Sequence, residues 1–139
     1  MLDLLEPATR PPAAQVRRGD AGHGIRIEGL RRRQGASLEA VQPLVRRLVG
    51  RYAPVSIWLF GSRARGDARP DSDWHIMVVV PDDAPEGDLD LGEAWRVRSG
   101  TGIAADIVPV RHGEFMEDLA VPDALPYEVA MDGVLLHER

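Results

Sequence analysis

The side chains that could do chemistry gather in the stretch LFGSRARGDARPDSDWHIMVVV, residues 59–80. Asp73 and His75 stand two positions apart at the start of an apolar run. On a strand, side chains two apart point to the same face, about 6.5 to 7 Å from each other along the chain. Asp106 interrupts a later apolar run, where a lone carboxylate is costly unless it is solvated, paired or bound to metal. The pattern therefore predicts polar groups that converge at one end of a sheet.

Gly61 and Ser62 follow the apolar run that precedes this group. A glycine lets the backbone turn closely, and Ser62 stands where a helix or tight turn would start. Free backbone amides beside a hydroxyl would form a cradle for phosphate. A phosphate cradle that faces carboxylates is the arrangement for metal-assisted phosphoryl or nucleotidyl chemistry, in which divalent cations bridge the negative groups.

Each of these residues also has a purely structural interpretation. Gly61 and Ser62 would form an ordinary tight turn, and Asp73 would be a turn residue or a helix cap after proline. Asp106 would pair with an arginine, and His75 would be a polar residue tolerated in a site that has lost its activity.

The arginines and tryptophans near this stretch have structural interpretations as well. Arg63, Arg65 and Arg69 are expected in a solvated, partly ion-paired turn. The tryptophans are expected in the core or at an interface. Stacking on a nucleotide base is the alternative for Trp74, because it lies next to the predicted site. The tryptophans occupy positions 58, 74 and 95.

One helical face is expected before the first strand, because six apolar residues follow a helical spacing. Pro43 fits poorly inside a helix, so the regular part is expected to begin near Gln42, with Pro43 in the first turn. The six residues are Val41, Leu44, Val45, Leu48, Val49 and Tyr52.

Three apolar runs predict strands, at 55–60, at 76–80 and within 103–110. The first two are continuously hydrophobic, which indicates burial on both faces. Helices are expected within 89–100, 112–120 and 126–132, and residues 134–138 are expected to form an edge strand. Strands separated by helices predict an α/β fold, with helices packed on a small mixed sheet.

Composition divides the chain into a predicted arm, residues 1–36, and one domain, residues 37–139. The arm is rich in Pro, Gly and Arg, with seven arginines against four acidic residues, whereas the domain has ten against eighteen. Its cluster at 31–33 is expected to be a solvated tail, and nucleic-acid binding through it is possible but not favoured. Cysteine is absent, and no apolar run approaches the ~20 residues that cross a bilayer. A cytosolic protein without a membrane partner is therefore expected, and an oligomer is possible.

The stretch GSRARGDARPDSDWHI resembles the signature of the minimal nucleotidyltransferases of the DNA polymerase beta superfamily. In that family a Gly-Ser pair ends the first strand, an Asp-any-Asp pair opens the next, and a third Asp lies on a later strand. The ending DALPYEVAMDGVLLHE resembles the family's last helix and strand, so the likeness covers residues 37–138. The matching positions are Gly61, Ser62, Ala64, Arg65, Gly66, Ser72, Asp73 and Asp106.

The resemblance implies a protein that binds a nucleoside triphosphate with Mg2+ and transfers a nucleoside monophosphate, AMP from ATP in the first instance, to a hydroxyl. Gly61 and Ser62 would hold the triphosphate, and Arg65 is the arginine that matches the family's position. Asp73 would ligate the metal, and Asp106 would help to activate the acceptor hydroxyl as metal ligand or base. Some minimal members are antitoxins that modify or sequester a helical HEPN toxin.

The sequence departs from the family at His75, which stands where the second metal-binding carboxylate is expected. Mg2+ prefers oxygen ligands, whereas imidazole suits Zn2+, Ni2+ or Co2+, with Mn2+ less favoured. The metal set would then be Asp73, Asp106 and His75, with Mn2+ an alternative to Mg2+. The two functional hypotheses are an active nucleotidyltransferase and a degenerate binding protein that neutralises or scaffolds a partner such as a HEPN-type toxin.

Overall fold

A computed structural model of the chain describes residues 38–139, so the predicted arm lies outside the described residues. Four strands form one sheet in the order β3-β2-β1-β4. Strand β1 is antiparallel to both of its neighbours, and β3 is parallel to β2, so the sheet is mixed as predicted. The strands are β1 (Ser56–Phe60), β2 (Trp74–Val80), β3 (Ala105–Arg111) and β4 (Val134–Glu138).

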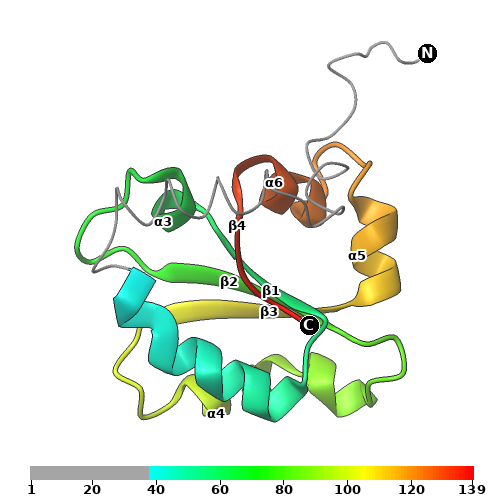
Figure 1. Ribbon diagram of the computed structural model, residues 1–139, viewed down its shortest axis with the longest axis horizontal. Coiled ribbons are helices and arrows are strands. Elements are labelled where there is room, and N and C mark those ends of the chain that lie inside the picture. The colour runs from blue at the N-terminus through cyan, green and yellow to red at the C-terminus, as the bar shows by residue number, and fades with distance from the viewer. Residues whose placement is uncertain (1–37) are drawn as a thin grey trace.

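Helices cover both faces of the sheet (Figure 1). The helix at 38–52 and α4 lie on one face, and α5 and α6 lie on the other. A single turn, α3, follows β1, and a short 3-10 helix, η2, precedes α4. This confirms the predicted α/β architecture. The helical bounds are α3 (Ser62–Arg65), η2 (Glu86–Leu89), α4 (Leu91–Arg98), α5 (His112–Asp118) and α6 (Leu125–Asp132).

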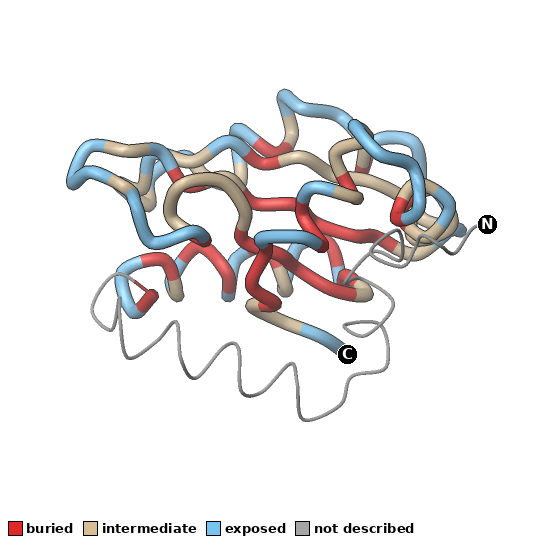
Figure 2. Tube along the Cα trace, turned by 90° about the horizontal axis from the view of Figure 1, so that it is seen from above, coloured by how far each residue is buried: buried red, intermediate tan, exposed pale blue. Residues whose placement is uncertain are grey.

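Alternation along the central strand β2 divides the core into two clusters. Ile76 and Val78 point to the helix at 38–52, whereas Met77 and Val79 point to α5 and α6. All four are buried, and the strands form the buried centre of the molecule (Figure 2). His75 therefore belongs to the face covered by α5 and α6, because its side chain shares the direction of Met77.

The prediction about Pro43 is wrong, because the helix already includes residue 38 and continues unbroken to residue 52. Pro43 is exposed, while Leu38 and Val41 are buried in the same cluster. A proline inside a helix costs about 3 kcal/mol, and burying one large aliphatic side chain contributes about 1.5–3 kcal/mol. Burial of Leu38 and Val41 together thus offsets the cost of the proline.

No helix between residues 38 and 139 is long and apolar enough to cross a membrane.

Candidate functional site

The turn after β1 depends on a glycine. Gly61 has φ +80°, in the left-handed region that favours glycine, and its carbonyl oxygen accepts hydrogen bonds at 3.0 Å from the amides of Ala64 and Arg65. A Cβ atom built on Gly61 would lie 3.0 Å from Cδ2 of His75. The chain therefore needs glycine here for the backbone angle and for the close approach of the imidazole.

The strand register aligns three residues across the sheet beside this turn. Phe60 pairs with His75, and His75 pairs with Asp106. The rings of Phe60 and His75 are 5.5 Å apart, and Nδ1 of His75 lies 3.7 Å from Oδ2 of Asp106. This last separation is too long for a hydrogen bond. The Asp106 side chain is 69% exposed, so its carboxylate is open to solvent and to a ligand.

Asp73 stands apart from this group. It is exposed, directly before β2, and its carboxylate has no hydrogen bond or ion pair to residues 38–139. By strand alternation it faces the same side as His75. In the part of the chain that the structure describes, no three His, Asp or Glu side chains are gathered closely enough to hold a metal ion. The structure thus brings His75 and Asp106 together and leaves Asp73 at the rim.

A hollow of about 220 Å³ lies between the glycine turn and α6. We call it the turn hollow. Arg65, one of the predicted nucleotide contacts, lines it and pairs with Asp67 at 3.3 Å, and both side chains are largely exposed. Sequence reasoning missed two acidic residues of α6 that also line it, although their spacing of four on a predicted helix was visible. The hollow is lined by Phe60, Gly61, Arg65, His75, Leu125, Glu128 and Asp132.

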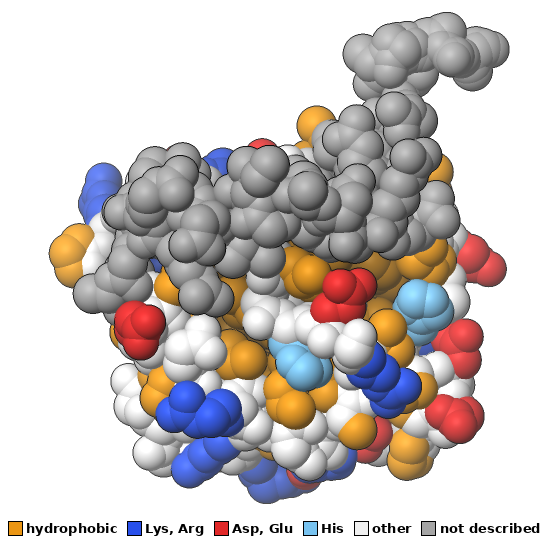
Figure 3. All heavy atoms as spheres, viewed as in Figure 1, with side chains coloured by type: hydrophobic (Ala, Val, Ile, Leu, Met, Phe, Trp, Pro, Cys, Tyr) orange, Lys and Arg blue, Asp and Glu red, His pale blue; other side chains and the backbone are white. Residues whose placement is uncertain are grey.

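A second hollow, of about 380 Å³, lies along β3, and His75 lines both. We call it the edge hollow. Leu91 and Trp95 of α4 lie on one side of it, and His75 and Asp106 on the other. Trp95, expected in the core or at an interface, is 58% exposed. His75 therefore stands where the two hollows meet. On the face seen in Figure 3, histidine side chains lie among apolar and charged ones.

Arg63 anchors the loop that leads to β2. Its guanidinium donates to the carbonyl oxygens of Ser72 and Pro70, at 2.8 and 3.1 Å, and lies 4.5 Å from the centre of the Trp74 ring. Arg63 is half-buried, so it is less solvated than expected, and its contacts are carbonyl groups and an aromatic ring. Trp74 is buried in the core, as expected, rather than free to stack on a base.

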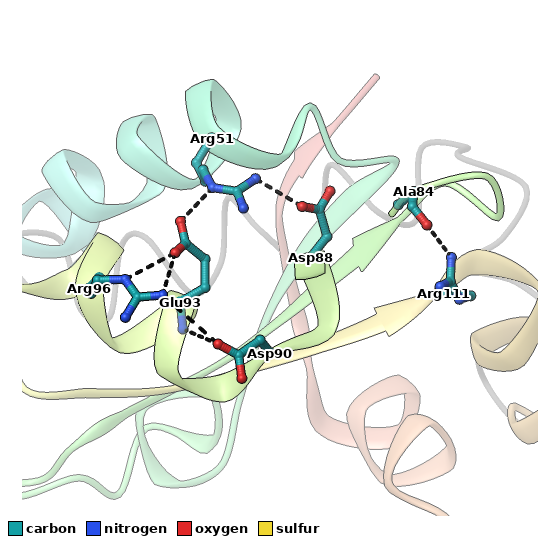
Figure 4. A network of polar contacts seen from close by, with 7 residues as sticks. All are labelled: Arg51, Ala84, Asp88, Asp90, Glu93, Arg96 and Arg111. Atoms are coloured by element: carbon teal, nitrogen blue, oxygen red, sulfur yellow. Dashed lines mark hydrogen bonds and ion pairs between the residues drawn. The ribbon is translucent and has the colours of Figure 1, made fainter. Parts of the chain in front are cut away.

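A network of charged residues fixes α4, which forms one side of the edge hollow (Figure 4). Arg51 donates to Glu93 at 2.7 Å and to Asp88 at 3.0 Å, and Arg96 donates to Glu93 at 2.9 Å. The hydrogen bond from Arg51, followed by that from Arg96, lowers the pKa of Glu93. Asp90 caps the helix by accepting from the amide of Glu93.

Comparisons with known proteins point to one family. The family model described as the nucleotidyltransferase domain matches residues 41–129. A crystal structure of a proposed nucleotidyltransferase from Sulfolobus solfataricus aligns with a TM-score of 0.53 and 22% identity, over 79% of this chain and 87% of that chain. At that identity the likeness concerns the fold alone. No curated protein matches the chain.

Proposed function

Because the chain belongs to the nucleotidyltransferase domain family, we propose that it is a metal-dependent enzyme that moves a nucleoside monophosphate, AMP from ATP, onto a hydroxyl group. The acceptor would be a protein, an RNA or a small molecule. One observation carries the proposal: the Gly61 turn, His75 and Asp106 come from three neighbouring strands and meet at the same end of the sheet.

The proposed roles follow the position of each group. Gly61 and Ser62, in the turn that opens α3, would hold the triphosphate, with Arg65 on the wall of the turn hollow. The acceptor oxygen would bond to the α-phosphorus while the bond to the bridging oxygen breaks. Pyrophosphate leaves with the electron pair, and the hydroxyl proton passes to a base. Asp106, exposed on β3, is the group proposed to receive that proton or to orient the hydroxyl.

The metal ion would arrive with the nucleotide, because no three His, Asp or Glu side chains of residues 38–139 are gathered closely enough to hold one alone. Mg2+ is usually held by one or two carboxylates together with substrate phosphates and water. Asp106 and Asp73 are exposed carboxylates that would provide the protein's oxygen ligands, and His75 would add a nitrogen that Mn2+ accepts more readily than Mg2+. Bound there, the ion would neutralise charge on the phosphates.

A second candidate is a binding protein with the same fold that neutralises or scaffolds a partner such as a HEPN-type toxin. The imidazole of His75 favours it, because a neutral ring supplies no negative charge where the family resemblance leads us to expect a carboxylate. The ring is also packed against Phe60 and Gly61.

Calorimetric titration of ATP distinguishes the two candidates. We expect wild type to bind ATP with Mg2+ or Mn2+. The Asp106→Asn variant should bind ATP more weakly, or transfer the nucleotide at a rate lower by roughly 100-fold or more. Glu117→Gln, on the exposed side of α5, is the matched control and should change neither. Absence of heat from wild type together with clear binding by His75→Asp would overturn the enzyme and favour the binding protein.

A further inference from the structure

The outer edge of β3 has no strand beside it among residues 38–139, because β3 ends the sheet. The register shows which of its residues face outward. The amide of Trp74 donates to the carbonyl oxygen of Ala104 at 2.9 Å, and Trp74 aligns with Ala105. In a parallel ladder every second residue bonds to the same neighbour. Ala104, Asp106, Val108 and Val110 thus face β2, which leaves Ala105, Ile107 and Pro109 facing outward.

Local bonds limit this free edge to two residues. Before it, the amide of Ile103 donates to Oγ1 of Thr101 at 3.1 Å, and its carbonyl oxygen accepts from Arg98 at 3.4 Å. Beyond it, Pro109 has no N–H to donate. Ala105 and Ile107 therefore direct two amides and two carbonyls outward, and we call this pair the edge window. Ala105 is half-buried, and Ile107 is 8% exposed.

The edge hollow surrounds the edge window on both faces of the sheet. Leu91 and Trp95, one helical turn apart on α4, are 65% and 58% exposed, the highest values among the large apolar side chains of residues 38–139. They lie on the face of Ala105 and Ile107, while Asp106 lies on the opposite face beside His75. An added strand alternates its side chains between the same two faces.

The negative charge of the domain that carries the edge window favours a basic segment. Asp106 and Arg98 line the edge hollow, and Glu128, Asp132 and Arg65 line the adjoining turn hollow. Residues 37–139 as a whole carry eighteen acidic residues and ten arginines. The three carboxylates that line the hollows are exposed.

We propose that the edge window binds an extended, basic peptide segment of a partner protein as an added strand. One side chain of the segment is apolar and lies on Leu91 and Trp95, and the next carries a hydroxyl that points toward Asp106. The inference rests on the proposed function and deepens it, because it makes that hydroxyl the acceptor. A second copy of the chain fits less well, since a stable dimer buries about 1,600 Å² and the edge window with two exposed apolar side chains offers far less.

Binding of a synthetic probe to the full chain tests this assignment. The probe is a fluorescently labelled, end-capped pentapeptide of sequence Arg-Leu-Ser-Leu-Arg, followed by fluorescence anisotropy. Ala105→Pro removes the outward amide of residue 105, just as Pro109 lacks an outward amide in the same strand. We expect it to weaken binding about tenfold. The opposite change, Pro109→Ala, adds an outward amide and should tighten binding several-fold.

Methylated probes test the backbone pairing on the unmodified protein. A strand uses alternate amides on each of its edges. N-methylation of one alternate set of amides in the peptide should abolish binding, and methylation of the other set should leave it intact. This result does not depend on whether Ala105→Pro folds, which circular dichroism and thermal melting establish separately.

Several outcomes would overturn the assignment. They are absence of probe binding to wild type, equal affinity of both methylated peptides, and unchanged affinity in a folded Ala105→Pro variant. A dimer that Ala105→Pro converts to a monomer would assign the edge window to a second copy. Titration of ATP on the same preparations separates the two proposals. Probe binding without ATP binding would support the docking edge and overturn the proposal of an enzyme. ATP binding without probe binding would support the enzyme and overturn the docking edge.

Discussion

The charged residues of α4 and those at the Gly61 turn lie in two regions that are built differently. In the first region Arg51, Glu93 and Arg96 make short hydrogen bonds of 2.7–2.9 Å (Figure 4). In the second, His75 and Asp106 remain 3.7 Å apart. The first region holds α4 to the helix at 38–52, whereas the second leaves its polar groups available.

This difference separates charges that stabilise the fold from charges that can meet a ligand. Removal of one partner of a pair lowers the stability of the fold, because the other partner is left without its hydrogen bonds. An exposed carboxylate keeps its hydration, so removal changes stability little. Substitutions in the α4 network should therefore change stability, and substitutions at the site should change ligand binding.

The largest expected loss of stability comes from backbone strain at the site. The comparison of the two regions therefore applies to their charged side chains and not to Gly61. We expect Gly61→Ala to lower the free energy of unfolding by about 2–3 kcal/mol, because alanine disfavours φ +80° and its Cβ would displace the His75 ring. Gly50→Ala is the control, because this helical glycine is exposed and has nothing within 4 Å of an added Cβ. The substitution should raise the free energy of unfolding by about 1 kcal/mol. Urea unfolding measures both, and similar values for the two variants would contradict the expectation.

Loss of one charge in each region tests the comparison directly. Arg51→Met should lower the free energy of unfolding by about 1–2 kcal/mol, since Asp88 is nearly buried and would lose its partner. Asp106→Asn should stay within about 0.5 kcal/mol of wild type. Denaturant titrations of the two variants decide the matter. Equal losses would mean that the site also contributes to the fold.

Acid should weaken the α4 network through Glu93. The hydrogen bonds from Arg51 and Arg96 lower its pKa in the folded state from the ordinary 4.5. Its contribution to stability is therefore present above about pH 4.5 and is lost as the pH falls through the lower, folded value. Unfolding titrations across this range should show a shallower acid dependence in Glu93→Gln than in wild type. An identical dependence would exclude Glu93 as a contributor.

Tyr52 should give the smallest effect and sharpen the contrast within the helix at 38–52. Its hydroxyl is buried without a hydrogen-bond partner in residues 38–139, and burial raises its pKa, an effect that neighbouring Arg51 opposes. Tyr52→Phe should therefore change stability by less than about 0.5 kcal/mol at neutral pH. Wild type should lose stability as the pH rises above 10, the ordinary tyrosine pKa, toward the raised value, and the phenylalanine variant should lose less. A large loss in the variant at neutral pH would reveal a bond to the hydroxyl.

The strands and helices were predictable because their signals are local. Continuous apolar runs gave the buried strands β1 and β2, and the helical spacing that includes Leu44 and Leu48 gave the buried face of the first helix. Pro43 was misread because its local cost is outweighed by burial of residues that touch distant strands. The start of that helix was therefore decided by tertiary packing rather than by propensity.

The site was predictable in part. Alternation put Asp73 and His75 on one face, but the approach of His75 to Asp106 depends on the parallel register of β2 and β3, which no local pattern specifies. The exposure of Trp95 and the position of Glu128 likewise follow from how α4 and α6 settle on the sheet. The metal and nucleotide roles of Asp73, Asp106 and the Gly61 turn stay predictions.

The pairing of β1 with β4 has a consequence for synthesis on the ribosome. Ser56 aligns with Glu138, so β1, the first described strand, gains its second neighbour only when β4, the last strand, has been synthesised. Until β4 has left the ribosome, one edge of an apolar strand stays bare in the nascent chain, and such edges recruit chaperones or associate wrongly. A messenger truncated before β4 would accordingly yield an aggregation-prone product, not a smaller working domain.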